Sequence, residues 1–387
     1  MGKYDKWLLI ATVLLVSFGA LMIYSTTSVI TPRLAHKGVT DFFYFKRHIF
    51  TIIIGFSFMF IAYSMRPSFI RKMTIPLLIF SFFLLVLVFI PHIGVSAGGA
   101  KRWIRIWPST FQPSELVKLS MVIFLARYMS MPGYRTDSFV SFIKPIIFLI
   151  PFQIAILMQP DFGAAMSLAF LTVAMLFLSG IRMRYLVSLL VSAVPIVYLL
   201  MMEPYRFRRI ISFLDPWKDP QGNGFQLVQS FIALGSGGIT GVGLGSSKQK
   251  LSYLPESHTD FIFSIIGEEF GFIGLLVIMT LFLLLFIKGI AIAHKAKDEF
   301  VYYLTIGLSL MIALQALINF SVATGLLPTK GLPLPFISYG GSALLVNMAA
   351  IGMLLNISRG DWITIPSCSK EKMKRRRAKR ILYDKKI

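Results

Sequence analysis

Two charged side chains lie close together in the segment FQPSELVKL, residues 111–119. Glu115 and Lys118 are three residues apart at the start of an apolar run, so on a helix they share one face. One explanation is structural: Pro113 and Glu115 favour a helix N-terminus, and Lys118 neutralises Glu115. The other is functional, because a basic group in an apolar run needs an acidic partner, and nearby loops supply further candidates. The sequence leaves both explanations open.

The segment YLPESHTDFIFSIIGEEFG, residues 253–271, contains the strongest candidate for a general base. Ser257 and Asp260 precede the apolar run with the spacing of a capping box, so one interpretation is that Asp260 only starts a helix. The alternative is a carboxylate held at the edge of the apolar run beside a basic residue, which suits proton transfer. Glu268 and Glu269 lie deeper in the run, and we expect them to be structural.

The composition shows what kind of chain must position these residues. Of 387 residues, 56% are hydrophobic and 14% are charged, and the mean hydropathy is +0.74, whereas soluble domains carry about 25% charged residues. The chain is therefore an integral membrane protein, with a formal charge of +22. The 35 phenylalanines exclude intrinsic disorder, and the single cysteine, Cys368, excludes a disulfide scaffold.

Ten apolar runs are candidates for membrane spans, since about 20 residues cross the hydrocarbon core. An even number of spans places both termini on the same side of the membrane. Lys and Arg in the short loops 66–72, 181–184 and 288–299 indicate that this side is the cytoplasm. The prediction is an all-α polytopic membrane protein with about ten transmembrane helices, both termini cytoplasmic, and a large extracellular loop, 203–260, between spans 7 and 8. The predicted spans are 7–24, 49–65, 73–91, 114–129, 140–157, 164–180, 185–202, 261–287, 300–322 and 341–357.

Positive charge gathers in a tail and in the predicted outer loops. Residues 370–387 form a basic cytoplasmic tail that follows a membrane domain of residues 1–369. Solvated loops or attraction to lipid headgroups explain most basic clusters in membrane proteins. Clusters on the outer side run against the usual trend, however, and favour an anionic ligand such as phosphate or pyrophosphate. These clusters are Lys101, Arg102 and Arg105 around Trp103; Arg206, Arg208 and Arg209; and Lys248 and Lys250.

The sequence carries no recognisable metal or nucleotide motif. The five histidines are scattered, and cysteine ligands are lacking. The glycine cluster at 235–245 matches no phosphate-binding motif, and we expect it to make tight turns and close backbone contacts. No metal site and no cofactor are therefore predicted, and assistance by a divalent cation stays open.

Six segments resemble those of a known family. They run from about residue 98 to 342 with family-like spacing, and TDFIF together with LPFISYGG is highly specific. On these residues the chain resembles the SEDS family of bacterial cell-envelope proteins, and the division-associated FtsW branch in particular. The segments are GGAKRWI (98–104), FQPSELVKL (111–119), QPDFG (159–163), DPWKDPQGNGFQLVQS (215–230), ALGSGGITGVGLGSSKQKLSYLPESHTDFIFSIIGEEFGFIG (233–274) and GLLPTKGLPLPFISYGGS (325–342).

The resemblance implies a peptidoglycan glycosyltransferase that polymerises lipid II into glycan strands during cell division. Its SEDS transmembrane domain, 1–369, would act on the outer face of the bacterial cytoplasmic membrane, at the division septum. The implied partners are lipid II, the growing glycan strand, a class B penicillin-binding transpeptidase and other division-complex proteins, with no nucleic acid. A sporulation-specific relative is hard to separate from this branch on sequence alone.

The resemblance also implies roles for individual residues. Asp260 of HTDFIF matches the essential acid, a general base toward the 4-hydroxyl of the acceptor sugar, and Lys118 of QPSELVKL matches the lysine expected to pair with it. Polyprenyl pyrophosphate would leave with inversion at the donor sugar. Ser252 stands where relatives often carry an acid, so an accessory acid is lost there. The residues expected to bind substrate are Lys101, Arg102, Trp103, Gln112, Glu115, Arg206, Arg208, Glu256, His258 and Ser338.

Two other functions compete with this one. A lipid II flippase also suits ten spans and charges within the membrane, but a conduit should carry polar residues along its depth, and here they gather at the outer edge. A scaffold for the division machinery would leave Asp260 without a role. The basic tail suits such a scaffold as an additional function, by docking a cytoplasmic partner or anionic lipid.

Overall fold

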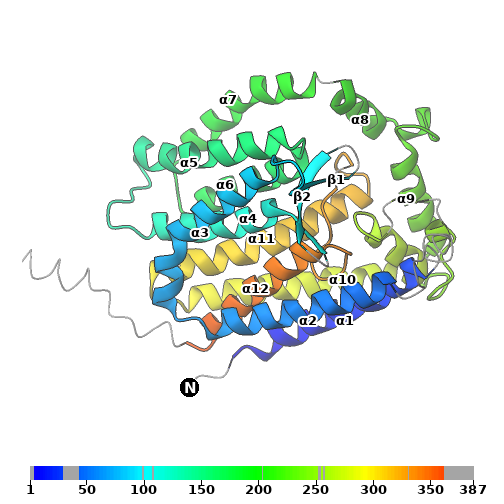
Figure 1. Ribbon diagram of the computed structural model, residues 1–387, viewed down its shortest axis with the longest axis horizontal. Coiled ribbons are helices and arrows are strands. Elements are labelled where there is room, and N and C mark those ends of the chain that lie inside the picture. Colours follow the sequence, from blue (N-terminus) through cyan, green and yellow to red (C-terminus); the bar gives the residue numbers. More distant parts are fainter. Residues whose placement is uncertain are drawn as a thin grey trace, which may run out of the picture.

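The computed structural model is built mainly of α-helices (Figure 1). It describes residues 4–28, 43–97, 100–106, 109–202, 204–251, 254–255, 258–329 and 331–360. The predicted tail, 370–387, and Glu256 lie outside these residues. The helices are α1 (Lys6–Thr27), α2 (Phe43–Ser64), α3 (Pro67–Leu87), α4 (Pro113–Met129), α5 (Phe139–Met158), α6 (Phe162–Leu178), α7 (Met183–Met201), α8 (Pro204–Leu214), α9 (Phe225–Gly237), α10 (Ile262–His294), α11 (Glu299–Ala323) and α12 (Gly341–Ser358).

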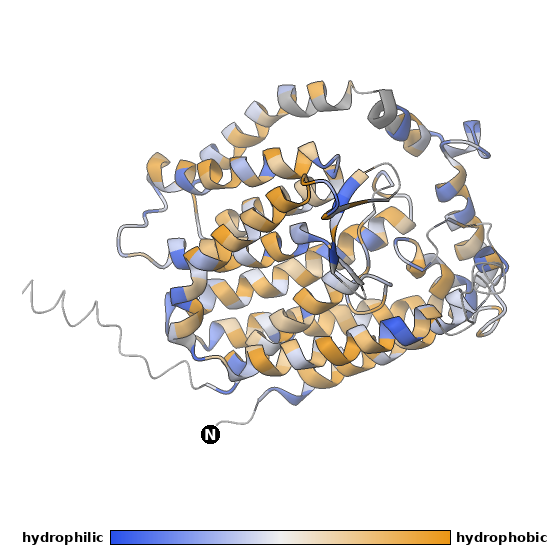
Figure 2. Ribbon diagram, viewed as in Figure 1, coloured by the Kyte–Doolittle hydropathy of each residue, from blue (hydrophilic) through white to orange (hydrophobic). Residues whose placement is uncertain are grey.

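Each of the ten predicted spans overlaps one α-helix, namely α1 to α7 and α10 to α12. Seven helices in the described residues are long and apolar enough to cross a membrane. Helices α6 and α7 contain shorter apolar stretches. Helix α4 has 17 residues and carries Glu115, Lys118 and Arg127, so it is the least apolar of the ten. Figure 2 shows the bundle helices as predominantly hydrophobic ribbons.

A small antiparallel sheet lies between α3 and α4, and the sequence analysis did not predict it. Trp103 pairs with Val95 and Ile104 with Phe111, so aromatic and β-branched residues face each other across the strands. The all-α prediction therefore holds for the membrane helices and is wrong for this segment, where the strands are too short to give a clear alternating pattern. The strands are β1 (Gly94–Ala97), β2 (Ala100–Ile106) and β3 (Ser109–Phe111).

The beginning of α1 and the end of α12 meet at one end of the bundle. The backbone N–H of Asp5 donates to Ser358 Oγ at 3.0 Å, and Lys288 Nζ, near the end of α10, lies 3.5 Å from Asp5 Oδ2. Figure 1 shows the sheet, α8 and α9 toward the opposite end. The long segment between α7 and α10 thus lies away from both described chain ends.

Helix α10 is bent where the glycine-rich loop meets it. Gly271 interrupts the helix with φ 66° and ψ −165°, a positive φ that glycine adopts readily. The Val242 N–H donates to the carbonyl of Glu268 at 3.0 Å. A Cβ on Gly241 would lie 2.2 Å from the carbonyl oxygen of Glu269, so only glycine fits there. The predicted close backbone contacts of the glycine cluster are confirmed.

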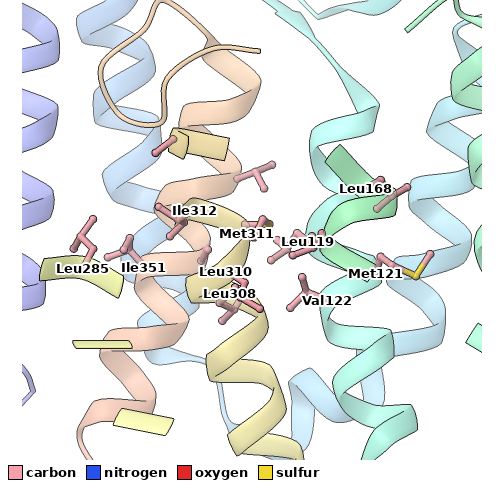
Figure 3. Close-up of a cluster of buried hydrophobic side chains, with 14 of the residues drawn as sticks. Leu119, Met121, Val122, Leu168, Leu285, Leu308, Leu310, Met311, Ile312 and Ile351 are labelled. Atoms are coloured by element: carbon pink, nitrogen blue, oxygen red, sulfur yellow. The ribbon is translucent and has the colours of Figure 1, made fainter. Parts of the chain in front are cut away.

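Helix α11 packs in the middle of the bundle and fixes the geometry of its neighbours. Figure 3 shows α11 side chains between α4 and α6 on one side and α10 and α12 on the other. This packing makes α11 a rigid support for the polar groups near its C-terminal end. The labelled side chains, all buried, are Leu119, Met121, Val122, Leu168, Leu285, Leu308, Leu310, Met311, Ile312 and Ile351.

Candidate active site

Asp260 lies in the turn that leads into α10, and a buried amide fixes its backbone. Asn319 on α11 donates through Nδ2 to the carbonyl oxygens of Asp260 and Leu332, both at 2.8 Å. The N-cap of α10 is Phe261, which makes no side-chain capping bond. Ser257, the other residue of the predicted capping box, lies outside the described residues. Asp260 therefore stands immediately before the helix start, at a backbone position set by α11.

The Asp260 carboxylate lies against the backbone of Gly331. A Cβ built on Gly331 would be 2.9 Å from Asp260 Oδ2, closer than real side-chain contacts allow. The segment before α12 thus approaches the carboxylate directly, and glycine provides the room. Because Asn319 bonds to both Asp260 and Leu332, one side chain holds the two segments together.

Ser338 and its neighbour Tyr339 attach the same segment to the residues before Asp260. Ser338 Oγ donates to the carbonyl of Thr259 at 2.5 Å and accepts the N–H of Leu334 at 2.8 Å. The Tyr339 N–H donates to the carbonyl of His258 at 2.9 Å. Ser338 was predicted to bind substrate, and the structure gives it hydrogen bonds that shape this segment.

Lys118 is buried on α4 and forms an ion pair with Glu115, Nζ to Oε2 at 2.8 Å. It also donates to Gln315 Oε1 on α11 at 2.9 Å, and Gln315 Nε2 donates to the carbonyl of Pro333 at 3.0 Å. Its ion-pair partner is thus Glu115, as the structural explanation expected, rather than Asp260. Lys118 connects to the Asp260 region through Gln315 and the segment before α12.

Four rings gather on the α2 side of this turn. Tyr339 lies with its ring centroid 5.8 Å from those of both Tyr44 and His258, and 5.9 Å from that of His48. His48 is 2% exposed, and its Nε2 has no hydrogen-bond partner among the described residues. Burial raises the pKa of Tyr339 above its ordinary value, while the charge of Arg47 acts in the opposite direction. These rings hold His258 against α2.

Arg102 and Gln112 converge on Asp161, the N-cap of α6. Arg102 Nη2 donates to the carbonyl of Pro160 at 2.7 Å, and its Nη1 lies 3.9 Å from Asp161 Oδ1. Gln112 Nε2 donates to Asp161 Oδ2 at 2.9 Å, and Asp161 Oδ1 accepts the N–H of Ala164 at 3.0 Å. Both residues were predicted to bind substrate. The structure uses them to join the sheet, α4 and α6.

The remaining predicted binding residues are spread over the sheet and α8. Lys101 and Trp103 on β2 are partly exposed, and Arg208 on α8 is exposed. Arg206 lies within α8, but its side chain is outside the described part of the chain, as is all of Glu256. One group therefore contains Asp260, His258 and Ser338. The ion pair of Lys118 and Glu115 is connected to this group through Gln315 of α11. The predicted basic residues of the sheet and α8 lie apart from it.

Comparison with known proteins identifies the family. The family model of FtsW, RodA and SpoVE, described as cell cycle proteins, matches residues 6–361. The chain belongs to this SEDS family. It is 44% identical to "Probable peptidoglycan glycosyltransferase FtsW" of Geobacter sp. (strain M18), over 92% of this chain and 96% of that protein. It is also 41% identical to "Stage V sporulation protein E" of Bacillus subtilis (strain 168), over 92% and 97%.

Solved structures agree with the SEDS fold. A chain from a structure described as "Structural coordination of polymerization and crosslinking by a peptidoglycan synthase complex" aligns with a TM-score of 0.75 and 26% identity, covering 92% of this chain and 98% of that one. The rod shape determining protein RodA of Thermus thermophilus aligns with a TM-score of 0.68 and 25% identity, covering 93% and 98%. The resemblance found in the sequence motifs is confirmed.

In this SEDS chain, sequence reasoning missed a buried ion pair beside the bend of α10. Lys250 Nζ lies 2.7 Å from Glu269 Oε1 and donates to Ser25 Oγ of α1 at 3.0 Å. Lys250 is 3% exposed, so its assignment to an outer basic cluster is corrected. Its partner lies 19 residues further along the chain. The two meet because the loop folds back along the first turns of α10, where the Val242 N–H donates to the carbonyl of Glu268. Lys248, two residues earlier, is exposed.

The neighbouring Glu268 stabilises the same loop through its backbone. Its carboxylate accepts the Ser247 hydroxyl and the N–H groups of Lys248 and Gln249, the latter two at 2.9 and 3.4 Å. The carboxylates of Glu268 and Glu269 therefore both hold the loop around residues 247–250, which leads toward Asp260. This arrangement is the structural role that the sequence predicted for Glu268 and Glu269.

The geometry of this SEDS site suits proton transfer at a carboxylate whose backbone is held in place. Asp260 is partly exposed, and its backbone is held from α11 and from the segment before α12. In the described residues, no group of three or more His, Cys, Asp or Glu side chains could hold a metal ion. A cavity of about 720 Å³ between α1 and α10 is lined by apolar residues such as Leu14, Phe18 and Val277, and none of the candidate residues lines it.

Proposed function

We propose that the chain is a peptidoglycan glycosyltransferase that polymerises lipid II, with Asp260 as its general base. The observation that carries this proposal is the placement of Asp260, at the N-terminal end of α10, with its carboxylate against Gly331 and its carbonyl held by Asn319. The relatives named as peptidoglycan glycosyltransferases support the same chemistry.

The proposed reaction is a single displacement at the donor sugar. Asp260 takes the proton from the 4-hydroxyl of the acceptor N-acetylglucosamine as its oxygen forms the bond to the anomeric carbon of the donor. The bond from that carbon to the polyprenyl pyrophosphate breaks, and the electron pair leaves with the pyrophosphate. An α-linked donor thus yields a β-linked product. Positioned proton transfer of this kind typically contributes ~10²–10⁴-fold to the rate.

Basic groups would balance the negative charge on the leaving pyrophosphate. Lys101 on β2 is partly exposed and suits direct contact with the pyrophosphate. Arg102 would add positive charge near the pyrophosphate while it also contacts Asp161. Lys118 contributes from a buried position, where it pairs with Glu115 and Gln315 fixes its direction. Its role is therefore to set the electrostatic field and to support the segment around Pro333.

The proposed membrane orientation puts both termini in the cytoplasm and Asp260 on the outer face. The Lys and Arg residues of the short loops 66–72, 181–184 and 288–299 support it, and so does the meeting of Asp5 with Ser358. In this orientation the segment 203–260 is extracellular, on the side where lipid II is polymerised. A cell-division role would place the protein at the septum.

The proposed partner is a class B penicillin-binding transpeptidase, which cross-links the strands that this chain makes. The similar chain in the structure of a peptidoglycan synthase complex supports this pairing of polymerisation with crosslinking. Other proteins of the division complex would then recruit both enzymes together.

The experiment that tests this function measures polymerisation and translocation on the same preparation. The full chain is purified with its transpeptidase partner and given lipid II in detergent, and glycan products are separated by gel electrophoresis. We expect strands of many disaccharide units. In parallel, the protein is placed in liposomes with labelled lipid II. Absence of polymer together with translocation of lipid II would instead indicate a flippase.

A further inference from the structure

Helix α8 has an apolar face that the described part of the protein leaves uncovered. Its sequence PYRFRRIISFL places apolar residues at 207, 210, 211 and 214, the spacing of one helical face. Of these, Ile211 is 43% exposed and Leu214 is 75% exposed. The helix packs mainly on its sequence neighbours, α7 and the 3-10 helix Pro216–Lys218, and Figure 1 shows it apart from the main bundle.

The sequence predicts α7 as the seventh membrane span, and this prediction places α8 at a membrane boundary. It begins three residues after the end of α7, whose last turns expose the apolar side chains of Tyr198 and Leu199, at 65% and 67%. Trp217, just beyond α8, is 59% exposed. Tyr and Trp are enriched where a membrane meets water. A helix that leaves a span at this depth and shows an apolar face has the bilayer itself as its nearest apolar surface.

The positive charge of α8 indicates which kind of lipid surface the helix would bind. Arg208 is exposed. It lies one turn before Ser212, on the side of the helix away from Leu214. Ser212 Oγ donates to the backbone carbonyl of Arg208 at 2.7 Å. Basic groups beside an apolar face are the signature of helices that lie in the plane of anionic membranes. The sequence assigned Arg208 to a phosphate-bearing ligand, and a phospholipid headgroup offers the same phosphate chemistry.

Helix α8 is also tied to the segment that touches Asp260. Arg209 Nη1 donates to the carbonyl of Thr329 at 3.2 Å. Two residues further along the chain, Gly331 lies against the Asp260 carboxylate. If α8 is held on a membrane, this hydrogen bond would therefore help to fix the position of the segment that contains Thr329 and Gly331.

We propose that α8 is an in-plane membrane helix that docks on an anionic lipid surface. Ile211 and Leu214 enter the boundary between headgroups and acyl chains, while Arg208 contacts lipid phosphates. The occupant of the exposed face is the bilayer on the side of the protein where Asp260 lies. Arg209 then holds the segment at Thr329 to a membrane-bound helix.

The test measures the depth of single residues of α8 in the full chain. The only native cysteine is replaced by Cys368→Ser, and single cysteines are introduced by Leu214→Cys, Ile211→Cys or, as the matched control, Ser212→Cys. Positions 212 and 214 are about 200° apart on a helix, so they report opposite faces. Each variant is spin-labelled in nanodiscs of phosphatidylcholine with or without phosphatidylglycerol, and its collisions with oxygen and with a water-soluble nickel complex are compared.

We expect labels at 214 and 211 to collide preferentially with oxygen and the label at 212 with nickel. The contrast is the difference between positions 214 and 212 in the ratio of oxygen collisions to nickel collisions. Phosphatidylglycerol should increase this contrast several-fold, and Arg208→Gln should reduce that increase. Equal nickel access at 212 and 214 would overturn the proposal. So would protection of 214 that appears only when the transpeptidase partner is added, because the face would then be a protein interface. Contrast that is unchanged by phosphatidylglycerol would overturn the anionic preference. Nanodiscs without lipid II exclude the substrate as the phosphate source.

Discussion

At the scale of single residues, the site depends on contacts between segments that are distant in sequence. Lys118 bonds to Gln315, 197 residues away, and Ser338 bonds to Thr259, 79 residues away. The motifs predicted Asp260 and Lys118 as important residues. They left open whether Glu115 or Asp260 is the ion-pair partner of Lys118, because that choice depends on how α4 packs against α11.

The close approach of Gly331 to Asp260 gives the first prediction. Gly331→Ala would put a Cβ within 2.9 Å of Oδ2, and the carboxylate, at the end of a flexible side chain, must move. We expect a several-fold or greater loss of polymerisation with little change in the melting temperature. Gly133→Ala is the control, since no atom lies within 4 Å of its built Cβ. An unchanged rate for Gly331→Ala would show that the carboxylate position does not matter.

The second prediction concerns the buried pair of α4. Lys118→Ala leaves the Glu115 carboxylate buried without its cation, a change that typically costs about 3–5 kcal/mol. Lys118→Ala with Glu115→Ala should be less destabilising, which thermal unfolding in detergent would measure.

The same lysine tests its coupling to the base. Polymerisation rates of Lys118→Ala, Asp260→Asn and the double variant form a cycle. Because Gln315 and the segment around Pro333 connect the two residues, we expect their losses to be non-additive. Strictly additive losses would contradict that connection.

At the scale of elements, the sequence predicted the ten apolar helices because their signal is long and continuous. It did not predict the sheet or the bend at Gly271, where short strands and a positive φ leave little trace in hydropathy. The glycine cluster did signal close backbone contact, although not which helix it would contact. The element that sequence reasoning described least well was the loop ending at Lys250, because burial cannot be seen in a polar sequence.

That loop gives the fourth prediction. Lys250→Met should lower stability by about 3–5 kcal/mol, because Glu269 would keep a buried charge and lose its ion-pair partner. The matched control is Lys248→Met, since the Lys248 side chain is exposed. Replacing both partners, Lys250→Met with Glu269→Leu, should recover part of the loss. Equal melting temperatures for the two single variants would contradict a buried pair at this position.

At the scale of the whole molecule, the formal charge of +22 divides into parts with different functions. The basic tail, 370–387, lies outside the described residues and remains a predicted docking segment. Lys118 and Lys250 are buried and form ion pairs with glutamates. The exposed arginine of α8, Arg208, belongs to the end of the bundle where Asp260 lies, which suits both a membrane surface and a pyrophosphate-bearing substrate.

The central claim is that Asp260 is the base for glycan polymerisation. Its most direct test compares initial rates of lipid II polymerisation by the wild-type chain and by Asp260→Asn, each in complex with the transpeptidase partner. Asparagine keeps the size of the side chain and the backbone bond from Asn319. We predict a rate lower by ~10²–10⁴-fold with an unchanged melting temperature. Equal rates for the two proteins would contradict the account.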